Sequence, residues 1–305
     1  MVDSEIEELS RGLIDKIEFY IPEQVNFVEI EEIANRLGLN VKRHKLKESG
    51  WTFSITGELN QRLSFFMFRR DGTYSRKAVV RPDDFESYEE MKVFIINLIG
   101  RNQFECAEVY RTDFAVDIPD TFENLKKYLY STRKKFCKVF LNDGERMSGI
   151  QIGRKPEVVI MYDKALEAKI PGPLTRIEIQ MSSNAKAVES FLQLPLLVEL
   201  VDGQYNRLFR KVSFEGSTFI DPSKIEDRFQ LMGFVRAKTL TDEVGSHLAR
   251  KRCKYMADLS CAYSDFVESH PYHVDLDKVL MRDLCYFFGQ PARAETLHEF
   301  WEDDY

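Results

Sequence analysis

The same order of strand and helix patterns occurs twice along the first two thirds of the chain. The first repeat predicts strands at 14–21, 51–57, 63–70 and 76–81, a helix at 30–37 ended by Gly38, and an amphipathic helix at 88–99 before Gly100. The second predicts strands at 108–118, 136–141, 149–153, 158–162 and 174–181, a helix at 122–133, and the start of another at 186–192. Two such units in tandem predict an α+β fold, an antiparallel sheet backed by helices.

The last hundred residues follow a different pattern. Segments 241–266 and 274–288 have helical spacing and few strand features. We therefore expect an α+β domain over residues 1–215 and a mostly helical C-terminal region over residues 216–305.

Composition is that of an ordinary soluble protein of 305 residues, with 44% hydrophobic and 30% charged residues. No apolar run reaches the roughly 18 residues that a membrane span needs, and we expect a cytoplasmic protein without a membrane partner. The 5 cysteines include no CxxC pair, which disfavours a zinc ribbon or a disulfide framework.

The net charge of −7 argues against a general nucleic-acid coat, but the charge is distributed unevenly. Both ends of the chain are acidic, and basic residues concentrate at 42–47, 126–138 and 250–254. We expect the basic side chains of 126–138, with Arg154, to lie on the same side of the fold as Tyr162.

The segment YRTDFAVDI predicts a strand with an unusual polar face. Because side chains alternate along a strand, Arg111, Asp113 and Asp117 share one face. Two carboxylates on a buried strand need a cation, which is either a metal ion or an Arg or Lys partner. A salt-bridged strand end therefore remains an alternative to a metal site.

The segment TRIEIQM supplies a second polar face, in which Arg176, Glu178 and Gln180 alternate with isoleucines. If the two strands are neighbours, Asp113, Asp117 and Glu178 converge. Ligands with only oxygen donors suit Mg²⁺ or Mn²⁺ rather than zinc. A ladder of Glu and Arg side chains is the alternative.

An apolar run at 158–161 leads into Tyr162, Asp163 and Lys164. A tyrosine here is a candidate nucleophile, although most single tyrosines are structural. The phenol has an ordinary pKa near 10, so its reaction at neutral pH needs a metal-polarised phosphate or a nearby cation.

The ordered set of motifs between residues 108 and 181 resembles the rolling-circle replication initiators of plasmids and phages, of the staphylococcal Rep type. That family has an R-x-D-x-A-x-D strand, a strand containing glycine, an apolar run into Tyr-[Asn/Asp]-Lys, a Glu five residues after the Tyr, and an R-x-E strand. The matching residues are Arg111, Asp113, Ala115, Asp117, Gly153, Arg154, Tyr162, Asp163, Lys164, Glu167, Arg176 and Glu178.

The resemblance implies metal-dependent, sequence-specific nicking and joining of DNA through a 5′-phosphotyrosine. It assigns Tyr162 as the nucleophile, assisted by Lys164, with Asp113, Asp117 and Glu178 as ligands of Mg²⁺ or Mn²⁺. It also implies a two-fold repeated fold related to the His-hydrophobic-His endonucleases. Implied partners are an origin hairpin or single strand of DNA, a host helicase and a second copy of the chain. Candidate DNA contacts are Arg111, Arg154, Arg176, Lys134 and Lys135.

Two other functions remain open. Residues 30–41 resemble the first helix and turn of a helix-turn-helix, followed by basic residues at 42–47, which would fit a non-enzymatic DNA-binding regulator. An ordinary amphipathic helix explains the same segment. The chain also has no His-x-His, and Lys155 and Pro156 stand where the family has a serine-containing turn, so an inactive relative is a further alternative.

Overall fold

The computed structural model describes the two repeats and one C-terminal helix. The described residues are 6, 8–21, 27–45, 51–70, 73–125, 129–131, 137–142, 146–185, 187–198, 208–209, 212–214, 219–220, 267–268 and 274–289.

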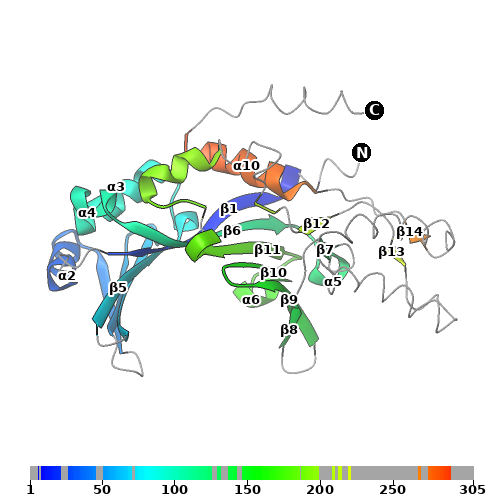
Figure 1. The fold of residues 1–305 in the computed structure, drawn as a ribbon, viewed down its shortest axis with the longest axis horizontal. Coiled ribbons are helices and arrows are strands. Elements are labelled where there is room, and N and C mark those ends of the chain that lie inside the picture. The colour runs from blue at the N-terminus through cyan, green and yellow to red at the C-terminus, as the bar shows by residue number, and fades with distance from the viewer. Residues whose placement is uncertain are drawn as a thin grey trace. The chain divides into compact units, whose positions relative to one another are not determined.

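One sheet of ten strands organises these residues, in the order β2-β3-β4-β5-β1-β6-β11-β10-β9-β8 (Figure 1). Every pairing whose register is described within this sheet is antiparallel, which confirms the predicted α+β class. In each repeat the first strand lies beside the last, because β1 neighbours β5 and β6 neighbours β11. The strands are β1 (Arg11–Tyr20), β2 (Asn40–Lys45), β3 (Trp51–Thr56), β4 (Arg62–Arg70), β5 (Thr73–Val80), β6 (Glu108–Ile118), β8 (Cys137–Asn142), β9 (Arg146–Arg154), β10 (Glu157–Asp163) and β11 (Thr175–Ser182).

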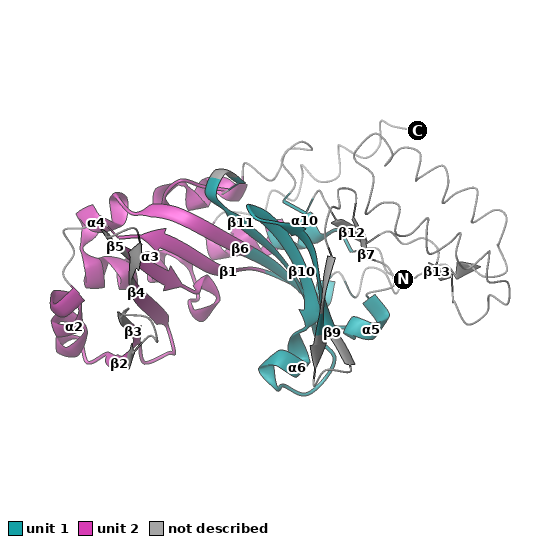
Figure 2. Cartoon of the chain, turned by 60° about the horizontal axis from the view of Figure 1, so that its bottom comes forward, with its two compact units in different colours: residues 1–12, 114–185, 201–280 teal, residues 13–113, 186–200, 281–305 magenta. Residues whose placement is uncertain are grey.

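The chain divides into two compact units, of which unit 2 contains residues 13–113, 186–200 and 281–305 (magenta in Figure 2). Its helices cover one face of strands β1 to β5, where aromatic rings form the core. The ring of Phe27 lies 5.4 Å from that of Phe53 and 5.7 Å from that of Phe65. The helices are α2 (Phe27–Arg36), η1 (Pro82–Asp84), α3 (Tyr88–Ile99), α4 (Arg101–Glu105) and η3 (Phe191–Leu196).

Unit 1 contains residues 1–12, 114–185 and 201–280 (teal in Figure 2). Its core is formed by the apolar faces of β6, β10 and β11, which include the buried Val116, Met161 and Ile177, and by Phe122 of helix α5. Its other elements are α5 (Phe122–Leu125), β7 (Leu129–Ser131), α6 (Lys164–Ala168), η2 (Ser183–Ala185), β12 (Val212–Phe214), β13 (Phe219–Ile220) and β14 (Val267–Glu268).

Helix α10 (Leu276–Phe287) contributes to the core of each unit. In unit 1, Val279 and Leu280 are buried, and a Cβ placed on Gly12 would lie 2.4 Å from the Cα of Leu280. In unit 2, Leu284 of the helix is buried, and the ring of Phe288, which follows the helix, lies 5.4 Å from that of Tyr88. The absence of a side chain at Gly12 therefore lets the backbone of the helix approach β1. The proposed division at residue 215 stays a prediction.

Several predicted elements are confirmed, two of them at the predicted bounds. Helix α3 covers 88–99, with Ser87 accepting from the backbone N–H of Glu90 and Gly100 following at φ 85°. Strand β6 covers 108–118, and α10 lies within the predicted 274–288. The predicted helix at 30–37 is α2, which ends before Gly38 at φ 72°.

Two predicted helices are wrong. The helix predicted at 122–133 ends at Leu125, and 129–131 form strand β7, because they pair with β12. The helix predicted from 186 is replaced by the 3₁₀ helix η3, which contains Pro195, a residue without a backbone N–H donor.

The helix-turn-helix interpretation of 30–41 does not match the structure. The residues after α2 form β2, which pairs in antiparallel register with β3, so the described part of this segment has no recognition helix. Among the described residues no helix has the length and apolarity to span a bilayer. The predicted helix at 241–266 lies outside the described residues.

Replacing Gly12 with Val tests the contact between β1 and α10. The added side chain would meet the Cα of Leu280 at 2.4 Å and the carbonyl oxygen of Val279 at 2.8 Å. Overpacking of this kind costs about 1–3 kcal/mol, so urea denaturation is expected to show a loss of that size in the free energy of unfolding. Gly38→Asn is the control, since nothing lies within 4 Å of that position and Asn tolerates a positive φ. Equal stability of Gly12→Val and the parent chain would contradict this packing.

Candidate active site

Tyr162 lies near the end of β10 and is partly exposed. It is directly opposite Arg176 on β11 and Gly149 on β9. Because residues opposite each other share a face of the sheet, Tyr162 and Arg176 lie side by side on the face that does not carry Met161 and Ile177. The structure therefore places the predicted nucleophile beside a cation on the neighbouring strand.

Gly149 makes room for this tyrosine. A Cβ at position 149 would lie 2.9 Å from the Cβ of Tyr162 and 3.0 Å from the carbonyl oxygen of Met161. Any larger residue would have to displace the base of the Tyr162 side chain. Glycine inside a strand marks a close approach of this kind.

Lys164 and Asp163 follow Tyr162 at the start of α6. The Nζ of Lys164 lies 5.9 Å from the centre of the Tyr162 ring and 2.5 Å from Oε2 of Glu167. The Asp163 carboxylate accepts a hydrogen bond from the backbone N–H of Leu166 at 2.9 Å and so caps the helix. Lys164 thus adds a second positive charge near the phenol ring.

Asp117 and Arg176 form a buried ion pair within unit 1. Nε and Nη2 of Arg176 donate to the two carboxylate oxygens of Asp117 at 2.6 and 2.7 Å. The side chains are only 5% and 10% exposed. Of the two explanations that the sequence leaves open for this carboxylate, the structure contains the arginine partner.

Asp113 also has cationic partners. Arg111 donates to both of its oxygens at 2.6 Å, and Nζ of Lys16 lies 2.9 Å from Oδ2. Arg111 and Lys16 also lie 3.7 and 3.5 Å from Glu18, which pairs with Lys77 of β5. We call these five side chains, Lys16, Glu18, Lys77, Arg111 and Asp113, the central ion-pair network.

The pKa of Glu18 reflects this network. Burial would raise the pKa of its carboxyl group, but the hydrogen bond from Lys77 and the charges of Lys77, Lys16 and Arg111 outweigh burial and lower the pKa below its ordinary value of 4.5. Glu18 is thus held as a carboxylate between three cations.

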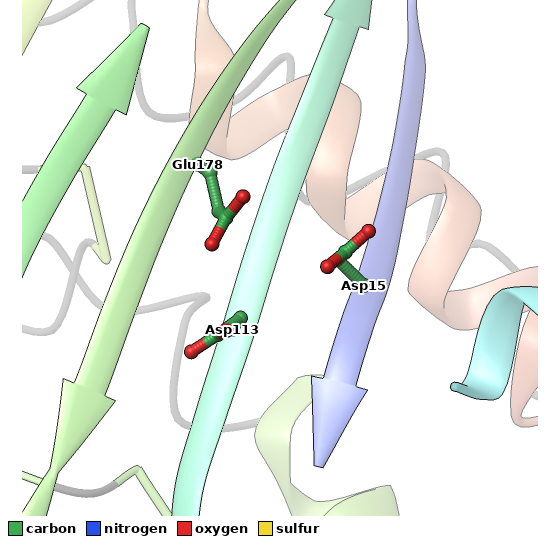
Figure 3. Close-up of side chains that lie close together, drawn as sticks. All are labelled: Asp15, Asp113 and Glu178. Atoms are coloured by element: carbon green, nitrogen blue, oxygen red, sulfur yellow. The ribbon is translucent and has the colours of Figure 1, made fainter. Parts of the chain in front are cut away.

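Three carboxylates from three strands lie close together. Figure 3 shows Asp15 of β1, Asp113 of β6 and Glu178 of β11, each with a ligand oxygen within 4.8 Å of the others. Hard oxygen donors of this kind can hold a divalent cation. Asp113 and Glu178 belong to the predicted ligand set, whereas Asp15 takes the place expected for Asp117. Because Lys16 and Arg111 also bind Asp113, an ion here would compete with them.

The remaining predicted site residues are Arg154, Lys134 and Lys135. Arg154 is exposed and lies opposite Glu157 in the register of β9 and β10. This is the far end of β10, about 17 Å from Tyr162 along the strand. Lys134 and Lys135 lie outside the described residues, as do 126–128, 132, 133 and 136, so the predicted placement of the basic run stays a prediction.

Sequence reasoning missed Gly149, Asp15 and Lys16 as parts of this region. Gly149 could have been identified, since it interrupts a strand pattern. The adjacent residues Asp15 and Lys16 are separated from Glu18 in β1 only by Ile17 and carry no spacing that relates them to β6.

No protein-family model and no curated protein matches the sequence. A solved structure of a rolling circle replication initiator protein from Geobacillus stearothermophilus is similar to this chain at a TM-score of 0.41 and 14% identity. The match covers 82% of this chain and 96% of that one. A similarity this low does not establish a shared function.

Removing the arginine of the buried pair tests its contribution to stability. Arg176→Met leaves the carboxylate of Asp117 without this cation in a buried position, so the free energy of unfolding is expected to fall by about 3–5 kcal/mol in urea denaturation. The double variant Asp117→Leu, Arg176→Met should recover most of this loss, because apolar side chains often replace a buried ion pair without cost. As a control, Lys92→Met removes an exposed pair with Glu89 and should change stability by less than about 1 kcal/mol. If Arg176→Met lost no more stability than Lys92→Met, the result would contradict a buried pair.

Acid titration tests the central ion-pair network. Since the pKa of Glu18 is lowered on folding, its carboxylate stabilises the protein above pH 4.5 and loses this effect as the pH falls through the lowered value. The stability difference between the parent chain and Glu18→Gln should therefore be constant at neutral pH and shrink below pH 4.5. Urea denaturation across the acid range measures it, with exposed Glu89→Gln as the control. A difference that stays constant down to acid unfolding would contradict the network.

Proposed function

We propose that this chain initiates rolling-circle DNA replication by nicking and rejoining one DNA strand through Tyr162. The observation that carries the proposal is the position of Tyr162, partly exposed on the sheet, opposite Arg176 and above Gly149. The ordered motifs from Arg111 to Glu178 support it, because the two repeats bring their strands into one sheet.

The reaction is a transesterification. The Oη of Tyr162 attacks a backbone phosphorus, the new Tyr–O–P bond forms, and the bond from phosphorus to the 3′ oxygen breaks. The proton lost by the phenol balances the one gained by the 3′-hydroxyl. Rejoining is the reverse reaction, so neither water nor an external energy source is consumed.

Three cations assist in this proposal. Lys164 lies near the Tyr162 ring and stabilises negative charge as the phenol loses its proton. Arg176 keeps Asp117 neutralised, which limits the repulsion between that carboxylate and an incoming phosphate. Arg111 has the same relation to Asp113.

The proposed metal is Mg²⁺ or Mn²⁺. The oxygen donors of Asp15, Asp113 and Glu178 fit a hard divalent cation in chemistry and proximity. When bound, such an ion polarises a phosphate oxygen and stabilises the charge that develops there.

The proposed setting follows from the activity. The partner is an origin hairpin or single strand of DNA, and a host helicase and a second copy of the chain are further proposed partners. The proposal places the protein in the cytoplasm, with nicking in residues 1–215 and a separate role for 216–305.

A specific observation favours one alternative, an inactive relative that keeps the fold. Asp113 and Asp117, two of the three carboxylates that the resemblance assigns to the metal, are each held by arginine through both oxygens. Such a protein would bind DNA without cutting it.

Tyr162→Phe separates these functions. The full chain is incubated with supercoiled cognate origin DNA and Mn²⁺ or Mg²⁺, and the covalent protein–DNA adduct is measured by denaturing gel. We expect an adduct with the parent chain and none with Tyr162→Phe, because only the nucleophilic oxygen is removed. Binding of the uncut DNA should remain.

The matched control is Tyr286→Phe, which removes a hydroxyl from a side chain that is 82% exposed on α10. It should form the adduct like the parent chain. An adduct that persists in Tyr162→Phe would assign the chemistry to another residue, and DNA binding by the parent chain without any adduct would identify the inactive relative.

A further inference from the structure

The two repeats of the sheet correspond strand by strand. From its edge inward, the first repeat runs β2-β3-β4-β5-β1 and the second runs β8-β9-β10-β11-β6. Strand β4 therefore takes the place of β10, and β5 that of β11. The correspondence allows the surroundings of Tyr162 to be compared with the equivalent place in the first repeat.

A carboxylate–cation pair marks that place in both repeats. In the second, Arg176 on the last strand holds Asp117 on the first strand. In the first, Lys77 on the last strand holds Glu18 on the first strand.

The residues directly opposite these two cations therefore occupy corresponding positions in the two repeats. Tyr162 lies opposite Arg176, and Phe66 lies opposite Lys77. The first repeat thus has a phenyl ring without a hydroxyl where the second has the candidate nucleophile.

Phe66 lies on the face of unit 2 that its helices do not cover. Its neighbour Phe65 is fully buried and contacts Phe27 of α2. Since side chains alternate across a strand, Phe66, Lys77 and Tyr20 point to the other face, and all three are partly exposed.

Four side chains form a row across neighbouring strands on this face, and we call them the aromatic row. Lys77 is directly opposite both Phe66 and Tyr20. The Tyr20 ring lies 5.3 Å from the Tyr110 ring, and Nζ of Lys77 lies 5.7 Å from the centre of the latter. With strands about 4.8 Å apart, the row extends over about 14 Å.

Three cations lie in or beside the row. Lys77 belongs to it, and Lys16 and Arg111 belong to the central ion-pair network, where all three share the carboxylates of Glu18 and Asp113. Asp15 and Glu178 lie close to Asp113, so the row offers a phosphate individual cations rather than a net positive charge. Exposed rings next to cations are the features that bind unpaired nucleic acid, since bases stack on rings and phosphates approach the cations. Paired bases in a duplex cannot offer their faces in this way.

We infer that the aromatic row binds single-stranded DNA and does not cut it, with Phe66 in the place of the nucleophile. This inference rests on the proposed function. It adds that the DNA is single-stranded and that the chain contacts it at a second surface, the aromatic row. One chain then carries one cleaving surface and one holding surface.

Binding of a fluorescent oligothymidine of about 12 nucleotides to the full chain tests the inference by anisotropy. Tyr20→Ala and Phe66→Ala should each weaken binding by about 5- to 150-fold, which corresponds to about 1–3 kcal/mol per stacked base. Phe66→Tyr and Tyr20→Phe keep a ring and should restore affinity to within about twofold. Circular dichroism and thermal unfolding establish that each variant is folded.

Tyr286→Ala is the matched control, because it removes an exposed aromatic ring from helix α10 and should leave binding unchanged. Unaltered affinity in folded Tyr20→Ala and Phe66→Ala would overturn the inference, and so would tighter binding of the duplex than of the single strand. Loss of the Tyr162 adduct does not decide this test, since binding is measured without cleavage. If the parent chain forms the adduct while Tyr20→Ala and Phe66→Ala leave binding unchanged, the inference about the aromatic row is overturned and the proposed function is not.

Discussion

The structure depends on the neutralisation of two carboxylates within one strand. Asp113 and Asp117 lie in the buried length of β6, where an unpaired charge would cost several kcal/mol. Each is held by an arginine through both of its oxygens, and Asp113 also has Lys16. These contacts connect β6 to β1 and to β11, its two neighbours in the sheet. These ion pairs thereby stabilise a polar face at the middle of the sheet.

Chemistry in the proposed site depends on how close two backbones can come. Gly149 lets Tyr162 lie against β9, while Arg176 occupies the other side. Tyr88, the first residue of helix α3, differs from Tyr162. It is buried, its hydroxyl donates to the backbone carbonyl of Phe191, and burial raises its pKa to about 12. The surroundings of each tyrosine therefore separate a structural role for Tyr88 from a candidate nucleophile at Tyr162.

Local patterns predicted most of the fold. Alternation and capping placed α3 and β6 at their observed bounds, because Gly100 and the apolar stripe act within a few residues. One prediction that failed concerns a segment whose partner is distant, because strand β7 depends on pairing with β12. The helix predicted from 186 failed for a local reason, Pro195. Propensity is a weak guide where tertiary pairing supplies the hydrogen bonds.

The sequence by itself determined the two repeats, the α+β class and which residues share a face with Asp113 and Asp117 along their own strand. Those properties follow from the period of two along a strand and from nearby turn and cap residues. Only the tertiary structure decided that Arg176 holds Asp117, that Lys16 reaches Asp113, and that Asp15 joins Glu178. Each contact joins residues distant in sequence, and depends on which strands are neighbours and on their register, which side-chain alternation alone does not determine.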